Sequence, residues 1–345
     1  MKVNKITIHP YKIKLKNRFV NSKREYLFKE GFIVELDVDG ISGYGEIVFL
    51  EGFSNFSKQE VYWKIEELKL LFDESLSYSK NDLFDLFKVF LNQIPPMHFA
   101  FDIALLDALS RKKYISIAEY LSPNSAMNII RFSSMHRHDK TINNKCIKIK
   151  LLCKNIDNDI NDLNNIFNQY SSDTVFRLDA NKGYCLEDAF KMLEFLSNKN
   201  IDYFEEPLID MSKRNLKKIK ESFNIKIAVD ETVFNSQVKI NELIEEKIID
   251  VVVLKASIYG GVEKILNFKK YLDKHSVNLV FSSSLENYVG NMAVINLISA
   301  LHLDCTHGVN NQLFFDFNEN VLFDEISSFL NIESIVGLGV KWNDS

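Results

Sequence analysis

The stretch TVFRLDANKGYCLEDAFKMLEFLSNKNIDYFEEP, residues 174–207, decides the fold. A short apolar run ends at Asp179, an amphipathic run with helical spacing follows, and a second short apolar run ends at Glu205. A strand, a helix and another strand in this order form the unit from which parallel sheets are built. The stretch therefore predicts a parallel sheet whose strands end in acidic residues.

The same unit repeats through the later part of the chain. Short runs rich in β-branched residues alternate with helix-like stretches, and the runs read IIRFSSM, CIKIKL, TVFRLDA, IDYFEEP, KIAVDET, DVVVLKAS and NLVFSSS. Polar residues fall at the carboxyl ends of many consecutive runs. In a closed barrel all of these ends meet at one face, whereas in an open sheet only those beside the switch point do. We therefore expect an α/β fold, a TIM-like (β/α)7β barrel. No Gly-x-Gly-x-x-Gly or Walker A motif follows any run, so no nucleotide site is expected.

The N-terminal part of the chain has a different pattern. Residues 1–16, residues 29–39 and the segment GISGYGEIVF alternate like strands of an antiparallel sheet. Helices are then expected from Ser57 to Leu71, across 81–91, and after the pair Pro95–Pro96. A sheet followed by helices indicates an α+β domain.

Three regions are expected along the chain. Residues 1–118 would form the α+β domain, and residues 119–317 the barrel. From residue 318 the strand–helix period is lost, so we expect residues 318–345 to return and pack against the N-terminal domain.

Composition narrows the class of protein. The chain has 345 residues, of which 46% are hydrophobic and 26% charged, so it can bury a large core and is not disordered. The net charge of −5 gives no support for nucleic-acid binding. The N-terminus has no apolar secretion segment and no run is long enough to cross a bilayer, so a soluble, cytoplasmic protein without a membrane partner is expected. The four cysteines show no Cys-x-x-Cys spacing and are expected to be buried thiols.

Asp179, Glu205 and Asp230 end three successive strands, roughly 25 residues apart. Three carboxylates brought together without a cation would repel and raise one another's pKa. Oxygen ligands with open positions suit Mg²⁺, for which Mn²⁺ can substitute. A single acid at a strand end is more often a helix cap or a surface ion pair, but three in series favour a metal site.

Lys150 and Lys255 would stand on opposite sides of that metal site. A nearby cation or amine lowers the pKa of a lysine and makes it a usable base near neutral pH. The α-proton of a carboxylate is very weakly acidic, and its removal leaves an enediolate that a metal ion stabilises. The pattern therefore predicts a metal-assisted base for such protons, although each lysine alone could equally pair with a neighbouring acid.

Further residues are candidates for substrate binding or for supporting the metal ligands. Lys148 lies two residues before Lys150 and so faces the same way, and Asn181 follows Asp179 by the same interval. Glu231 follows Asp230 and would orient a lysine.

The run Ser282, Ser283 and Ser284 closes the last strand segment. Small residues at the start of a helix expose backbone N–H groups, which would cradle an anion. Ser284 could equally be a simple N-cap.

The order and spacing of K-I-K, L-D-A-N, E-E-P, V-D-E-T and L-K-A-S resemble the enolase superfamily in its muconate-lactonising subgroup. Within that subgroup the chain is most similar to the o-succinylbenzoate synthases. GYGEIVFLEGFS resembles a segment of their capping domain, FAFDIALLDAL one of their helices, and FSSSLENYVG their seventh strand. The resemblance covers nearly the whole chain, and it implies that the N-terminal domain caps the barrel and is completed by the C-terminal tail.

The resemblance also implies an activity, the syn dehydration of 2-succinyl-6-hydroxy-2,4-cyclohexadiene-1-carboxylate to o-succinylbenzoate in menaquinone biosynthesis. Lys150 would remove the α-proton and then protonate the departing hydroxyl, while Lys255 would stabilise the enediolate from the other face. Mg²⁺ would bind the ring carboxylate, held by three ligands: Asp179, Glu205 and Asp230. The protein is then a metal-dependent carbon–oxygen lyase acting on a small carboxylate, with the loop of residues 17–28 covering the site.

Two alternative functions require different residues. A dipeptide epimerase or N-acylamino acid racemase of the same subgroup would use the two lysines as opposed acid and base. Such epimerases carry an Asp-x-Asp near the eighth strand that holds the dipeptide amine, and CTHGVNNQLFFDFNEN, residues 305–320, has none. The sequence therefore favours the synthase. A barrel that only binds a ligand would be expected to lack a metal ligand or a lysine, and none is missing.

Overall fold

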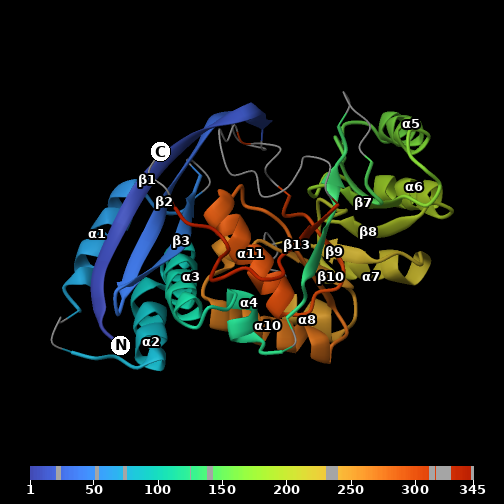
Figure 1. Ribbon diagram of the computed structural model, residues 1–345. Coiled ribbons are helices and arrows are strands. Elements are labelled where there is room, and N and C mark those ends of the chain that lie inside the picture. The colour runs from blue at the N-terminus through green and yellow to red at the C-terminus, as the bar shows by residue number, and fades with distance from the viewer. Residues whose placement is uncertain are drawn as a thin grey trace.

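The computed structural model describes residues 1–20, 25–50, 54–72, 76–124, 126–137, 143–230, 240–310, 315 and 328–342. An antiparallel sheet with its helices stands beside a barrel of parallel strands, and α3 and α11 lie between them (Figure 1). The strands are β1 Val3–Val20, β2 Glu25–Val38, β3 Ile41–Phe49, β4 Ile129–Phe132, β5 Ser134–Met135, β6 Cys146–Lys150, β7 Val175–Asp179, β8 Ile201–Glu205, β9 Ile227–Val229, β10 Val251–Leu254, β11 Asn278–Phe281, β12 Thr306–His307 and β13 Phe329–Asn331. The helices are α1 Lys58–Lys69, α2 Lys80–Leu91, α3 Pro95–Lys112, α4 Ile117–Leu121, α5 Ile156–Phe167, α6 Leu186–Leu196, α7 Lys213–Ser222, α8 Ile240–Glu245, α9 Ala256–Tyr259, α10 Val262–Lys274 and α11 Tyr288–Ala300.

The N-terminal sheet has the order β1-β2-β3, and both of its pairs are antiparallel. Its first two strands are longer than the alternation predicted. The backbone stays extended to Val20 and resumes at Glu25, so most of the expected covering segment is a hairpin and not a loop. The covering role assigned to that segment stays a prediction, because residues 21–24 lie outside the described residues.

Glycines allow β3 to lie directly on helix α3. A Cβ atom on Gly43 would come within 2.0 Å of the Ala104 carbonyl oxygen, and one on Gly45 within 2.0 Å of the Ala100 carbonyl oxygen. Only glycine fits where two backbones approach this closely. The GYG motif therefore fixes the position of the sheet on the helix that also faces the barrel.

The predicted helix starts are confirmed in this domain. Ser57 accepts a hydrogen bond from the Glu60 N–H, and Glu60 accepts one from the Ser57 N–H, which completes a capping box at α1. Helix α3 begins at Pro95, where a proline costs no backbone hydrogen bond.

The barrel closes through short parallel contacts. Strands β5 to β11 pair in sequence order as one parallel sheet. At one edge β4, which runs on into β5, pairs in parallel with β12, and at the other edge Ser282 bridges in parallel to Gly308 just after β12. The Gly308 N–H donates to the Phe281 carbonyl at 2.8 Å. Counting β4 and β5 as one position, eight parallel positions form the ring, as the TIM-like prediction requires.

Helices follow the strands from β6 onward and cover the outside of the ring. Strands such as β10, whose four residues are all buried, pack inside against the opposite strands and outside against these helices. The connection from β5 to β6 is shorter than the others. It spans only residues 136–145, and the described part of it contains no helix.

The C-terminal tail crosses from the barrel to the N-terminal domain. Strand β13 pairs antiparallel with β4, and further on Gly337 bridges to Ser116 beside α4. The Trp342 ring then lies 5.8 Å from the Tyr288 ring and 5.9 Å from the Tyr11 ring, centroid to centroid. The boundaries expected at residues 118 and 317 remain predictions.

The structure also bears on the burial of the cysteines and on membrane-spanning helices. The cysteines are free thiols, but only Cys146 is buried, and Cys185 is exposed, where its sulfur accepts the Asp188 N–H as the N-cap of α6. The expectation of four buried thiols was therefore wrong. None of the helices in the described residues has the length and apolarity needed to cross a bilayer.

Candidate active site

The strand register places three of the predicted site residues side by side. On neighbouring parallel strands Lys150 is the partner of Asp179, and Asp179 is the partner of Glu205. Each of the three is the last residue of its strand. Parallel strands in register present side chains of paired residues on the same face, so these three groups share one rim of the barrel.

Lys148 connects two of the carboxylates. Its Nζ lies 2.9 Å from Oδ2 of Asp179 and 2.7 Å from Oε2 of Glu205. Burial acts to lower the pKa of Lys148, but the charges of Glu205 and Asp179 outweigh it and raise that pKa well above its ordinary value. One ammonium group therefore stays charged and serves two carboxylates.

Glu205 shows that the negative charge is not fully balanced. Burial, followed by the charge of Asp179, raises the pKa of Glu205 to about 7, against the opposing effect of Lys148. Asp230 adds to this repulsion, which places it within electrostatic range of Glu205. An additional positive charge at this rim would relieve the repulsion.

Asp230 and Lys255 come from the next two strand ends. Asp230 follows β9 and Lys255 follows β10, and the Lys255 Nζ lies 3.9 Å from Asp230 Oδ2. In the ring of eight positions, β10 stands four places from β6. Lys255 and Lys150 therefore end strands on opposite sides of the barrel mouth.

Asn181 orients the first of the carboxylates. Its backbone N–H and its side-chain amide both donate to Asp179 Oδ1, at 3.1 and 3.0 Å, which leaves Oδ2 for Lys148. Asn181, Lys182 and Glu206 all have positive φ angles, of 46°, 61° and 45°. Residues other than glycine pay a strain cost in this conformation, and such residues gather at functional loops.

The remaining predicted site residues are Glu231 and the three serines after β11, and only the serines can be compared with the structure. Glu231 lies outside the described residues. Ser282, Ser283 and Ser284 stand at the mouth, but none of their N–H groups is free, since they donate to the Leu254 carbonyl, the Gly308 carbonyl and Glu286 Oε2 respectively. The expected cradle of open N–H groups is therefore absent. Ser284 is not the cap of the following helix either, because Asn287 accepts the first N–H groups of α11.

Glu286 was not among the predicted site residues. It is fully buried and accepts from the hydroxyls of Ser257 and Ser283, at 2.5 and 2.6 Å. The residue and Ser283 both stand within the segment FSSSLENYVG, but Ser257 comes from a separate loop, and local sequence patterns do not indicate that contact.

The donor set suits a divalent cation by its chemistry. Asp179, Glu205 and Asp230 offer only carboxylate oxygens, which Mg²⁺ prefers, and their mutual repulsion would be removed by such an ion. Within the described residues no three acidic, histidine or cysteine side chains already form a closed group around one point. The carboxylates fit the ion as ligands that would draw together on binding it.

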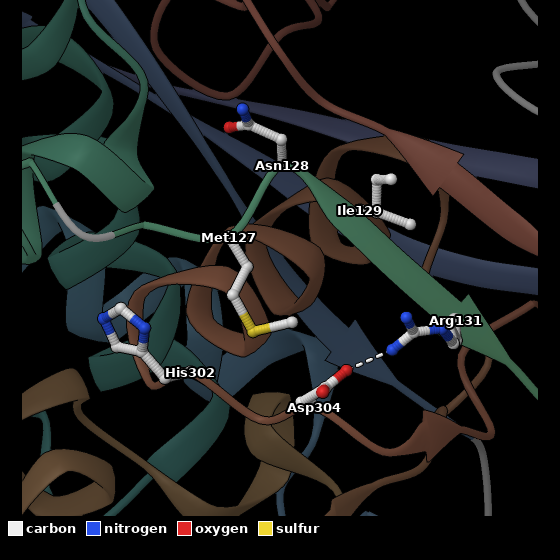
Figure 2. Close-up of a pocket in the computed structure, with 6 residues that line it drawn as sticks. All are labelled: Met127, Asn128, Ile129, Arg131, His302 and Asp304. Atoms are coloured by element: carbon white, nitrogen blue, oxygen red, sulfur yellow. Dashed lines mark hydrogen bonds and ion pairs between the residues drawn. The ribbon is translucent and has the colours of Figure 1, made fainter.

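A separate cavity of about 460 Å³ lies away from the mouth. It is lined by Met127, Asn128, Ile129, Arg131, His302 and Asp304, and the ion pair between Arg131 and Asp304 spans one side of it (Figure 2). These residues lie around the amino-terminal ends of β4 and β12, whereas active sites of such barrels form at the carboxyl ends. None of the predicted site residues lines this cavity.

Comparison with known proteins gives consistent matches. Residues 137–345 match the family model described as "Enolase C-terminal domain-like". An L-Ala-D/L-Glu epimerase of Francisella tularensis subsp. novicida is 27% identical, with 96% of each chain covered. An o-succinylbenzoate synthase of Aliivibrio fischeri is 24% identical over 81% of this chain and 82% of the relative. A solved dipeptide epimerase from Enterococcus faecalis, complexed with Mg and the dipeptide L-Leu-L-Tyr, superposes with a TM-score of 0.83 at 21% identity, over 98% of this chain and 99% of the other.

Proposed function

Because the chain belongs to the enolase superfamily, we propose that it is a racemase or epimerase acting at the α-carbon of an N-acylated amino acid. The main support for the proposal is the placement of two lysines and three carboxylates around the barrel mouth. Lys150 and Lys255 end strands on opposite sides of the mouth, and the strands between them end at three carboxylates: Asp179, Glu205 and Asp230. Two amines that face each other across a substrate can invert a carbon centre between them.

The proton balance of the reaction needs one neutral and one charged amine. The neutral lysine takes the α-proton from one face, and the ammonium of the other lysine returns a proton to the opposite face. When the opposite enantiomer is the substrate, the two lysines exchange these roles. Lys150 and Lys255 are the residues proposed for this, and Lys148, already bound to two carboxylates, is not.

Asp179, Glu205 and Asp230 would hold Mg²⁺. When bound, the ion would supply positive charge for the substrate carboxylate as the α-proton leaves. The solved neighbour with Mg and a dipeptide supports this assignment, as does the unbalanced charge at Glu205.

The relatives favour proton transfer over dehydration. The epimerase from Francisella aligns over nearly the whole of both chains, whereas the synthase from Aliivibrio aligns over less of each. The C-terminal residue of a dipeptide is itself an N-acylated amino acid with a free carboxylate, which defines the proposed substrate class. Residues 305–320 lack the Asp-x-Asp that would hold a free amine, so we expect N-acetylated or N-succinylated amino acids to be better substrates than free-amine dipeptides.

Hydrogen exchange at the α-carbon tests the proposal. The purified protein with Mg²⁺ in D₂O should replace the α-proton of N-acyl amino acids, followed by NMR, with change of optical rotation when one enantiomer is supplied. Lys150→Ala should lower racemisation by at least about a thousandfold. Normal racemisation by Lys150→Ala, or no exchange with any member of a panel of N-acyl amino acids and dipeptides, would refute the proposal.

Dehydration to o-succinylbenzoate is the second candidate, since one relative is such a synthase and the Asp-x-Asp is missing. It would use the same Lys150 as base. Appearance of the aromatic product from the cyclohexadiene acid, at a rate exceeding any α-proton exchange, would favour it.

A further inference from the structure

A cluster of buried ionisable groups lies where the N-terminal sheet meets the barrel. Lys29 comes from β2, Glu46 from β3, Tyr11 from β1, and Glu286 from the turn before α11. Lys29, Glu46 and Glu286 are each no more than 1% exposed. Burying such groups is costly unless each has partners, so the contacts of the cluster show what it is built to hold.

Glu286 joins two loops of the barrel mouth. Its Oε1 accepts from the Ser257 hydroxyl at 2.5 Å, and its Oε2 accepts from the Ser283 hydroxyl at 2.6 Å and the Ser284 N–H at 2.9 Å. Ser257 lies two residues after Lys255, and the two other serines follow β11. Both carboxylate oxygens are therefore occupied by the loops that follow β10 and β11, and the side chain has no surface with which to touch a substrate.

Lys29 brings a positive charge to the cluster from the N-terminal sheet. Its Nζ donates to the Phe49 carbonyl at 2.7 Å and to the Glu30 carbonyl at 3.0 Å. Burial lowers the pKa of Lys29 to about 8, while the nearby charges of Glu46 and Glu286 resist that change. Lys29 therefore lies close enough to both carboxylates for their charges to act on it.

Glu46 reaches from the sheet to the start of α11. Its Oε2 accepts from the N–H groups of Asn287 and Gly290, at 2.8 and 3.2 Å, and its Oε1 accepts from the Tyr11 hydroxyl. A Cβ atom on Gly290 would lie 2.3 Å from Glu46 Oε2 and 3.0 Å from the Cβ of Glu286. The two carboxylates are therefore packed against one glycine in the first turn of the helix.

We propose that Glu286 is a positioning residue that fixes the loop carrying Lys255, and that Glu46 of the N-terminal sheet holds the start of α11 beside it. The part concerning catalysis rests on the proposed function of Lys255. Ser257 lies in the short helix that follows Lys255, and its hydroxyl contacts Glu286 Oε1 at 2.5 Å and Ser284 Oγ at 3.1 Å. Because Glu286 also binds Ser284, losing its carboxylate loosens the backbone from which the lysine side chain extends. The N-terminal sheet then helps to position a proposed catalytic group through Glu46, which is buried away from the substrate.

Glu286→Gln is the central variant, because it keeps the shape of the side chain and removes its charge. Ser257→Ala removes one partner and serves if the first variant does not fold. Asp107→Asn is the matched control. Asp107 is equally buried on α3 and binds the tail through the Leu338 N–H at 2.7 Å, but it makes none of the bonds to the two loops.

The first measurement does not depend on any substrate. Amide hydrogen exchange should speed up in Glu286→Gln at Ser284, whose N–H donates to Glu286, and at Ile258 and Tyr259, whose N–H groups donate to the Lys255 carbonyl. These sites should keep wild-type protection in Asp107→Asn. Unchanged protection in Glu286→Gln, or equal loss in the control, overturns the positioning role.

The second measurement compares the two faces of the substrate. Lys255→Ala identifies the enantiomer whose α-proton that lysine removes, and Glu286→Gln should slow exchange of this enantiomer on the order of 100-fold, with only a few-fold loss for the other. Equal losses for both enantiomers would overturn the catalytic part of the proposal. Loss of amide protection in a protein whose wild type exchanges no substrate would instead refute the proposed function and leave the positioning role standing.

Discussion

Lys148 and Arg177 are partners in register on β6 and β7, yet their charged groups reach opposite ends of the barrel. The Lys148 ammonium binds Asp179 and Glu205 at the mouth. The Arg177 guanidinium donates to Asp202 Oδ2 and to the Thr306 carbonyl, both at 2.9 Å, at the base.

The two cations differ in how well the charge around them is balanced. Arg177 has one carboxylate, one carbonyl and the ring of Tyr203 at 4.8 Å. The exposed Lys226 also lies 3.5 Å from the same Asp202 carboxylate, so no negative charge is left in surplus at the base. Lys148 alone serves two carboxylates, with a third nearby. Balanced buried clusters serve structure, whereas a surplus of negative charge leaves a place for a cation or for a reacting group. The comparison predicts that mutations at the mouth change activity and that mutations at the base change stability.

Asp179→Asn should have the largest effect, and it should fall on activity. The variant removes one carboxylate from a site with surplus negative charge, and Lys148 keeps its ion pair with Glu205. The free energy of unfolding should therefore stay within about 1 kcal/mol of wild type. Activity should fall on the order of a thousandfold, through loss of a proposed metal ligand. Thermal unfolding with and without Mg²⁺ should show a stabilisation in wild type that the variant lacks.

The exposed Asp173, near the start of the same strand, provides a control for that experiment. Asp173→Asn should leave both activity and the Mg²⁺ effect unchanged. A large loss of stability in Asp179→Asn with activity retained would show that the mouth cluster is structural and would break the comparison.

Asp202→Asn should have the converse effect at the base. Arg177 is about 2% exposed and would lose its only carboxylate partner among the described residues, so the free energy of unfolding should fall by about 3 kcal/mol. Denaturant unfolding measures the loss, and kcat per folded molecule should be unchanged. Asp304→Asn is the matched control, because its ion pair with Arg131 is exposed on both sides and should contribute less than about 1 kcal/mol.

The sequence predicted the mouth better than the base, for a physical reason. Acids at successive strand ends follow directly from the strand–helix period, and parallel pairing alone brings Asp179 beside Glu205. Arg177 gave no such signal, because its partners are an acid near the start of the neighbouring strand β8 and a carbonyl from the far end of the chain.

The cluster at the domain junction was missed for a related reason. Lys29 and Glu286 are separated by most of the chain, and their approach depends on how the N-terminal sheet packs on α11. Local patterns cannot show this, since a lysine in KEGFIVE has the spacing of an ordinary strand residue. The open N–H cradle was predicted from Ser282–Ser284 because nothing in that run indicates that Glu286 turns back to occupy it.

Buried His307 should make the free energy of unfolding depend on pH, with an effect no larger than that expected for Asp202→Asn. Its Nδ1 accepts from the Phe281 N–H at 3.0 Å and its Nε2 lies 3.1 Å from the Leu303 carbonyl, which fits a neutral ring with the proton on Nε2. Burial lowers the pKa of His307 to about 4. The unfolded chain binds this proton near pH 6.5 and the folded chain does not, so stability should fall as the pH drops from about 6.5 to 4, by about 3 kcal/mol in total. The mouth has the opposite sign, since the raised pKa of Glu205 lowers stability as the pH rises through about 7. Urea unfolding between pH 4 and 7 should show that His307→Asn removes the part of the slope that His307 contributes, whereas His302→Gln at an exposed position preserves the wild-type slope. An unchanged slope in His307→Asn would place the acid sensitivity elsewhere in the fold.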